Sequence, residues 1–172
     1  FRDYAIENIP FSAIRPAATD PAGPTIAPRT IYQQAGGVVH SPNEAGWYLG
    51  PSSELGTTFG RQFGAAGETA VARTIVFKVE GYEKDREFFD YIAGERERQD
   101  DKTRFRILSV SNEVVTFKGT SCLKFSGVSE DHGSKGVNSR KFEYLKTTGY
   151  VCRHPANKDI AFQMEISHRG TD

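Results

Sequence analysis

The two cysteines of the chain, Cys122 and Cys152, have the spacing with the most definite chemical consequence. They lie at equal distances from Val137, at the centre of a polar segment that separates two alternating, strand-like stretches. If these stretches pair as an antiparallel hairpin centred on Val137, the cysteines become cross-strand neighbours at a spacing that a disulfide accepts. A disulfide would indicate an oxidising compartment and therefore an exported protein. The alternative is a pair of buried free thiols in a cytosolic protein.

The histidines do not have the spacing of a metal site. The chain contains four of them: His40, His132, His154 and His168. Zinc requires three or four converging ligands, and no pair of these histidines is spaced as His-x3-His. Cys152 and His154 would share a strand face, but oxidation of Cys152 would remove the thiolate that a Cys–His nucleophile needs. We therefore predict no metal ligands and no catalytic cysteine.

An enzyme would have to use Asp131 together with His132, His154 and His168. The hairpin register places His132 and His154 at opposite ends of the sheet, which argues against a shared cleft. The sequence also lacks Gly-x-Ser-x-Gly, phosphate-binding glycine loops, His-Glu-x-x-His and an Asp-rich calcium loop. We predict no catalytic residues and no cofactor.

The charge pattern excludes two classes of partner. Lys plus Arg and Asp plus Glu number 22 each, so no net charge attracts the chain to nucleic acid or to an anionic membrane. The arginines between residues 96 and 106 are interleaved with acidic residues, which cancels the local field. No apolar run approaches the roughly 18 residues that span a bilayer.

The first 45 residues differ in composition from the rest. Seven of the eight prolines fall at or before Pro51, and the segment from Pro10 to Pro28 alternates proline with Ala, Thr and Gly. This composition predicts an extended, polyproline-rich arm over residues 1–45. The arm is either a plain tether or a segment that binds a partner through its apolar residues, which are Phe1, Tyr4, Ile6, Ile9, Phe11 and Ile14.

Residues 46–172 have the pattern of a folded domain. The expected strands are 46–50, 57–63, 69–80, 104–110, 113–118, 121–129, 142–153 and 160–168, with a tight turn at Ser111-Asn112. One helix is expected over 84–99, with Asp85 as its N-cap. Short connections between successive strands predict an α+β domain: a single twisted antiparallel sheet, in meander order, with the helix packed on one face.

The last strand shows clean alternation. Ile160, Phe162, Met164 and Ile166 are expected to face inward, and the residues between them outward. A pocket between sheet and helix would be walled by six side chains: Phe77, Phe88, Phe89, Phe105, Phe162 and Met164. The same residues could form an ordinary core instead.

The C-terminal third is similar to a group of uncharacterised proteobacterial exported proteins and lipoproteins. The similar residues are Gly149–Pro155 with its Cys-Arg-His-Pro motif, Ile160–Ile166, Ser167-His168-Arg169, Gly46-Trp47, Phe88-Phe89 and Val128–Asp131. The resemblance implies a periplasmic or outer-membrane location and a Cys122–Cys152 pair, and carries no activity. The element order also resembles the PsbP family of lumenal accessory proteins, whose members attach to larger complexes. The long Pro-rich arm departs from the lipoprotein pattern, and no lipid-acceptor cysteine lies near the start.

These observations lead to one main expectation and one alternative. We expect a non-enzymatic accessory protein, periplasmic or at the cell surface, that docks on a larger protein assembly with the help of its arm. The alternative is a protein that binds a small apolar ligand between sheet and helix. Because the chain begins at Phe1 rather than Met, we expect an upstream segment that has either been removed or lies outside this sequence. Membrane association would be indirect or depend on an anchor outside this sequence.

Overall fold

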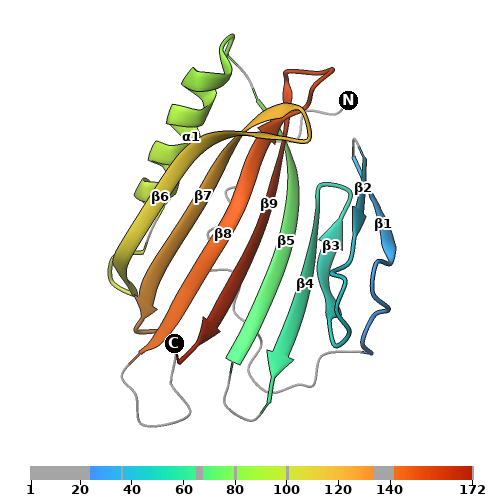
Figure 1. Cartoon of the computed structure of the whole chain (residues 1–172), viewed down its shortest axis with the longest axis vertical. Coiled ribbons are helices and arrows are strands. Elements are labelled where there is room, and N and C mark those ends of the chain that lie inside the picture. The colour runs from blue at the N-terminus through green and yellow to red at the C-terminus, as the bar shows by residue number, and fades with distance from the viewer. Residues whose placement is uncertain are drawn as a thin grey trace.

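The structure is a computed structural model that describes residues 24–35, 37–64, 68–79, 81–99, 101–133 and 142–171. In chain order, its elements are β1 (Ile31–Gln34), β2 (Gly37–His40), β3 (Tyr48–Ser53), β4 (Gly56–Phe63), β5 (Glu68–Lys78), α1 (Asp85–Gln99), β6 (Phe105–Phe117), β7 (Thr120–Asp131), β8 (Glu143–Arg153) and β9 (Ile160–Gly170). Within these ranges the strands form one seven-stranded antiparallel sheet and a separate β1–β2 hairpin, accompanied by one helix (Figure 1). The predicted fold class, an antiparallel sheet with one helix, is confirmed.

The strand order in the large sheet is β3-β4-β5-β9-β8-β7-β6. It consists of two meanders, β3 to β5 and β6 to β9, which meet where β5 pairs with β9. The predicted meander is thus interrupted once, because α1 carries the chain from β5 to β6 at the far edge of the sheet. Figure 1 shows α1 beside and behind β6 and β7, with the β1–β2 hairpin on the opposite side, next to β3.

The hairpin of β7 and β8 has the predicted register. Cys122 is paired with Cys152, and the ladder continues without a shift to Asp131 and Glu143. A disulfide joins the two cysteines, whose Cα atoms are 4.3 Å apart. The free-thiol alternative is therefore wrong.

The predicted turn at Ser111-Asn112 is wrong. Both residues lie inside β6, a single strand of 13 residues, and are paired with Ser126 and Phe125 of β7. The turn preference of a Ser-Asn pair is weak, whereas β7 offers a continuous ladder of backbone partners on this side. The one irregularity in β6 is a register shift between Ile107 and Ser109.

Helix α1 packs on the sheet through a core of large apolar side chains. The core comprises Val79, Phe88, Phe89, Leu123, Phe125, Val151 and Ala161, with Phe77, Tyr82, Ile92 and Ala93 packed against it. Phe88 and Phe89 come from the predicted apolar stripe of the helix and are each 1% exposed. The N-cap expectation for Asp85 is not met: its carboxylate contacts Arg153 and Lys158.

A stack of side chains fixes the C-terminal half of α1. The ring of Phe125 lies over Gly149, where an added Cβ would come within 2.4 Å of its Cζ. The guanidinium of Arg96 lies 3.5 Å from the centre of the same ring. That guanidinium is also 3.8 Å from the buried carboxylate of Glu165. The helix is thus anchored by a cation–π contact and an ion pair on β9.

Residues 24–45 differ from the extended arm that their composition predicts. Strands β1 and β2 pair as an antiparallel hairpin. Tyr32 and Val39 pack against a second core, which consists of Trp47, Phe59 and Ala70. The amide of Gln34 donates hydrogen bonds to the hydroxyls of Thr57 and Thr74, at 2.7 and 2.8 Å. The predicted anchors at positions 1, 4, 6, 9, 11 and 14 lie outside the described residues.

A groove on the helix-free face of the sheet

The two faces of the sheet follow from strand register. Phe77 of β5, Ala161 of β9 and Arg153 of β8 are successive partners across the sheet, so their side chains share one face. Phe77 and Ala161 belong to the core beneath α1, which identifies this as the helix-covered face. The alternate residues of the same strands therefore point to the opposite, helix-free face.

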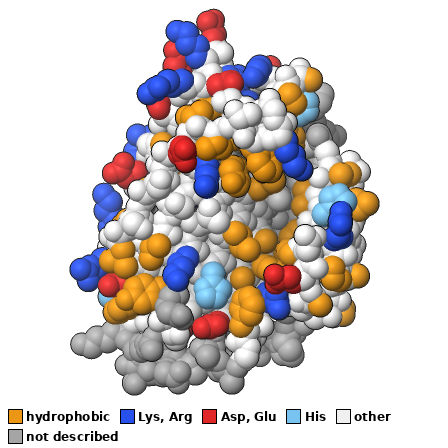
Figure 2. Space-filling view, in the orientation of Figure 1, with side chains coloured by type: hydrophobic (Ala, Val, Ile, Leu, Met, Phe, Trp, Pro, Cys, Tyr) orange, Lys and Arg blue, Asp and Glu red, His pale blue; other side chains and the backbone are white. Residues whose placement is uncertain are grey.

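The helix-free face contains a groove of about 610 Å³ between the β1–β2 hairpin and strands β5, β9 and β8. Its volume is within the range of small-molecule and peptide pockets. Figure 2 shows this face, with a central hollow bordered by hydrophobic side chains. The apolar lining residues are Val38, Val39, Pro42, Phe59, Phe117, Tyr150, Pro155, Phe162, Met164 and Ile166.

The floor of the groove is built by the alternation of β9. Phe162 lies between Val76 and Cys152, Met164 between Thr74 and Tyr150, and Ile166 between Ala72 and Thr148. Tyr150 stacks on Phe117 with ring centres 5.0 Å apart, which extends the apolar floor toward the β6–β7 turn. Ile166 remains 43% exposed. The structure thus leaves the most regular apolar face of the sequence uncovered by the helix.

This geometry corrects the predicted orientation of the last strand. The residues expected to face outward include Ala161 and Glu165, and both are buried on the helix-covered face. Space decides the orientation: Ala161 fits in the core under α1, Gly149 leaves room for the Phe125 ring on which Arg96 lies, and Glu165 is paired with Arg96.

The six predicted pocket residues are not together. Phe77, Phe88 and Phe89 belong to the core under α1, so they form an ordinary core rather than a pocket wall. Phe162 and Met164 line the groove on the other face. Phe105 lies at the start of β6, where the guanidinium of Arg104 is 4.8 Å from its ring centre. The expected pocket between sheet and helix is therefore wrong, and the groove lies on the opposite side of the sheet.

The histidines do not converge. His132 follows β7 and approaches the carboxylate of Glu130 at 2.9 Å, while His154 follows β8. The ten residues between the ends of the β7–β8 ladder correspond to about 30 Å of strand, so the two imidazoles are far apart. His168 is on β9 against the ring of Phe63, and His40 is on β2.

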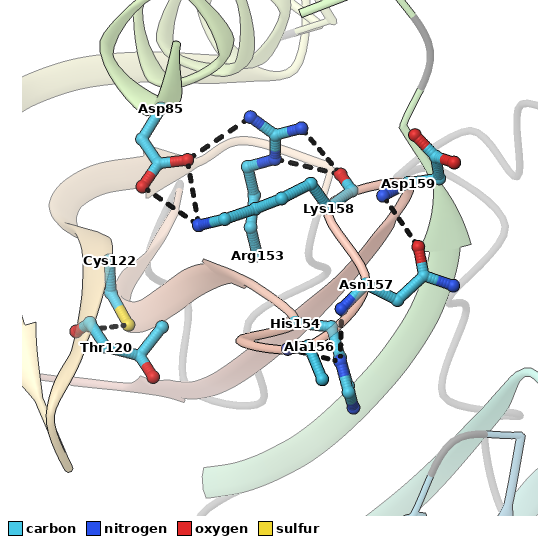
Figure 3. Close-up of polar contacts among 9 residues, drawn as sticks. All are labelled: Asp85, Thr120, Cys122, Arg153, His154, Ala156, Asn157, Lys158 and Asp159. Atoms are coloured by element: carbon cyan, nitrogen blue, oxygen red, sulfur yellow. Dashed lines mark hydrogen bonds and ion pairs between the residues drawn. The ribbon is translucent and has the colours of Figure 1, made fainter. Parts of the chain in front are cut away.

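The side chains of His154 and Arg153 organise the β8–β9 turn (Figure 3). The Nδ1 atom of His154 accepts hydrogen bonds from the backbone N–H groups of Ala156 and Asn157, at 3.1 and 3.0 Å. Arg153 is buried, and its guanidinium donates to the carbonyl oxygen of Lys158 and to the carboxylate of Asp85. The His-Pro part of the Cys-Arg-His-Pro motif thus shapes a turn, and the arginine joins this turn to the start of α1.

A buried carboxylate closes the opposite end of the sheet. Asp131 is 0% exposed and accepts two hydrogen bonds from Arg104, at 2.7 and 2.8 Å. Arg169 of β9 lies 2.7 Å from Oδ2, one of the two oxygens that Arg104 contacts. Burial alone would raise the pKa of Asp131, but the Arg104 hydrogen bonds and the charge of Arg169 outweigh it, so the pKa is lowered. A carboxylate held ionised between two arginines links three strand ends and is unsuited to proton transfer.

Within the described residues, no group of three or more His, Cys, Asp or Glu side chains is placed to hold a metal ion. In the same part of the chain, α1 is neither long nor apolar enough to cross a membrane. The fold and the groove define a class: an antiparallel sheet with a helix on one face and an apolar groove on the other. Comparison with known protein families and with curated proteins finds no match for this chain.

Sequence reasoning missed the hairpin wall of the groove. Val38, Val39 and His40 lie in a segment whose proline content suggested an arm, and four-residue strands are too short to show a period. The available signal was the run Ile31-Tyr32 and Val38-Val39 on either side of two glycines, which resembles a short hairpin.

Proposed function

We propose that this chain is a non-enzymatic, exported binding protein that holds an apolar segment of its partner in the groove of the helix-free face. The observation that carries the proposal is the uncovered apolar floor formed by Phe162, Met164 and Ile166. Soluble proteins seldom leave a contiguous apolar surface exposed unless it serves an interaction. The aromatic pair Tyr150–Phe117 adds the kind of side chain that is enriched at binding surfaces.

The titratable groups around the groove support binding rather than catalysis. Three charged residues near the groove, Arg73, Arg153 and Glu165, have their side chains on the helix-covered face according to the strand register, so these side chains point away from the groove. His40 of the hairpin, Lys118 of the β6–β7 turn and Tyr150 of β8 remain, and none of them is a carboxylate. The ring contact of His40 is with the carbonyl oxygen of Arg29, not with a carboxylate. A general acid–base pair would need two such groups within hydrogen-bond reach of one substrate atom.

The disulfide supports export. The Cys122–Cys152 bond persists in oxidising compartments and is rare in the cytosol. If the protein is exported, alkylation of the native protein from its source under denaturing, non-reducing conditions should leave both cysteines unmodified. Alkylation of either cysteine in the bulk of the protein would contradict the exported location.

An accessory role on a larger assembly is the form of binding that we favour, because the groove is partly open to solvent rather than enclosed. A free small apolar ligand is the second candidate, and the volume of about 610 Å³ is compatible with it. The two differ in a competition experiment. A soluble fatty acid such as laurate should displace a groove-bound probe efficiently only if the site is built for free ligands.

The proposal is tested with the fluorescent apolar probe 1-anilinonaphthalene-8-sulfonate. We expect saturable binding to the native chain, and binding about tenfold weaker in Ile166→Glu, because the substitution places a carboxylate on the apolar floor. The matched control is Val114→Glu on β6, a residue that is 55% exposed and lies outside the groove. Equal binding by all three proteins would overturn the groove as the binding site.

A further inference from the structure

The wall of the groove offers backbone hydrogen-bonding groups as well as apolar side chains. In the described residues, β2 is paired with β1 only. The backbone N–H of Ser41 donates to the carbonyl oxygen of Thr30 at 2.9 Å, which makes Thr30 and Ser41 a hydrogen-bonded pair at the end of the hairpin. Because such pairs alternate in antiparallel ladders, Tyr32 and Val39 form the next hydrogen-bonded pair.

The same alternation identifies the groups on the outer edge of β2. Val38 and His40 belong to non-hydrogen-bonded pairs, so their N–H and C=O groups point away from β1. No backbone group of the described residues bonds to them, and all four residues of β2 line the groove. Gly37 has open space on its Cβ side, with no atom within 4 Å. The hairpin therefore presents an unpaired strand edge beside the apolar floor.

We infer that the groove binds an extended peptide segment of a partner protein, which adds to β2 as a third strand over the floor of β9 and β8. This inference rests on the proposed function and names the chemistry of the ligand. An added strand would lie about 4.8 Å from β2 and stack about 10 Å above the large sheet. Its alternate side chains would point down to Phe162, Met164 and Ile166, and the others out to solvent.

The combination of edge and floor distinguishes a peptide from an acyl chain. An acyl chain would use the floor and leave the Val38 and His40 backbone groups to water, whereas a peptide strand satisfies both. Because an edge of four residues accommodates only a short strand, specificity would depend on apolar residues at every second position. Lys118 lines the groove and favours carboxylates among the solvent-facing residues of the ligand.

The test uses the full chain and a blocked eight-residue peptide that alternates leucine with glutamate or serine. Two derivatives of this peptide carry N-methyl groups on the backbone. In the first, the amide nitrogen of every leucine is methylated; in the second, the amide nitrogen of every polar residue is methylated. In a strand, these two sets of N–H groups lie on opposite edges. We expect one derivative to bind at least about tenfold more weakly than the parent peptide, and the other to bind nearly as well. Equal binding by all three peptides would overturn strand addition.

Substitutions in β2 test the same contact from the protein side. Val38→Pro removes an outward N–H while sparing the β1–β2 ladder, so it should weaken binding of the parent peptide about tenfold. Val38→Thr keeps the N–H and should bind normally. If Val38→Pro binds the peptide as well as the native chain does, the inference is overturned.

Further outcomes separate the inference from the proposed function. If the peptide fails to bind but the fluorescent probe still distinguishes Ile166→Glu from Val114→Glu, strand addition is wrong and the groove remains a binding site. If the probe does not distinguish them either, the proposed function fails as well. A last outcome concerns the first 23 residues of this chain. If the peptide binds only after residues 1–23 have been removed, the inference of a partner peptide is also overturned, because the N-terminal segment of this chain would then be the strand that pairs with β2.

Discussion

The two faces of the seven-stranded sheet use the same strands in opposite ways. On β8 and β9, the helix-covered face carries smaller or paired side chains: Ala161 and Val151 are fully buried, and the buried Glu165 is paired with Arg96. On β9, the helix-free face carries the larger apolar side chains, and Ile166 remains exposed in the groove. The face that looks most like a core in the sequence is thus the one that is not covered by the helix. A helix can pack closely on a sheet only where there is space as well as apolar surface. Along β9, the small residue Ala161 provides the space on one face, whereas the larger apolar side chains lie on the other.

The largest difference between the faces should appear when one phenylalanine is truncated on each. Phe88→Ala removes a side chain that is 1% exposed beneath the helix, so we expect a loss of about 3–5 kcal/mol in the free energy of unfolding. Phe162→Ala removes a half-buried ring from the groove floor and should cost less than half as much. Urea denaturation of both variants measures the difference. Equal losses would mean that the helix-free face is a second core rather than a binding surface.

The disulfide joins β7 and β8 on the face of the sheet that α1 does not cover. The two cysteines are 30 residues apart, so the cross-link should contribute about 3–4 kcal/mol. The double variant Cys122→Ala/Cys152→Ala should lose this stability and become insensitive to reductant. Thermal unfolding with and without dithiothreitol checks both points. A native chain whose Tm is unaffected by reduction would show that packing alone holds this face.

The pairing of the cysteines could be predicted because two residues at equal distances from Val137 face each other in an antiparallel hairpin centred there, and β7 and β8 have this register. The limits of the helix were predicted to one residue, since the stripe of Phe88, Phe89 and Ile92 has a clear helical period. The covered face of β9 could not be predicted. The orientation of β9 depends on Ala161, which packs in the core under α1, and on Gly149, which leaves room for the Phe125 ring. These two small residues lie on different strands, and only the folded sheet places them on one face. The groove was missed for the same reason, together with its hairpin wall.

Two glycines on the helix-covered face test whether space limits the packing there. Gly149→Ala would place a Cβ within 2.3 Å of the carbonyl oxygen of Met164 and 2.4 Å of the Phe125 ring, so we expect a loss of about 1–3 kcal/mol. Gly127→Ala is the matched control on the same face, because its Cβ meets only the Ser109 carbonyl oxygen, at 3.4 Å. Chemical denaturation should rank the two variants in this order. The opposite order would show that the Phe125 ring does not depend on Gly149 for its place.

The smallest expected effect is a pH dependence of stability, which should differ between a variant on the helix-covered face and one on the helix-free face. The pKa of Asp131 is lower in the folded chain than the value of about 3.9 expected when it is unfolded. Its stabilising contribution is therefore complete above pH 4 and is lost as the pH falls through the folded pKa. The stability difference between the native chain and Asp131→Asn should accordingly be constant near neutral pH and narrow on acidification below about pH 4. The control is Ile166→Gln on the helix-free face, whose difference from the native chain should stay constant over the same range. Urea midpoints between pH 7 and pH 3 provide the measurement, and a constant difference for Asp131→Asn would mean that its arginine contacts do not favour the ionised carboxylate.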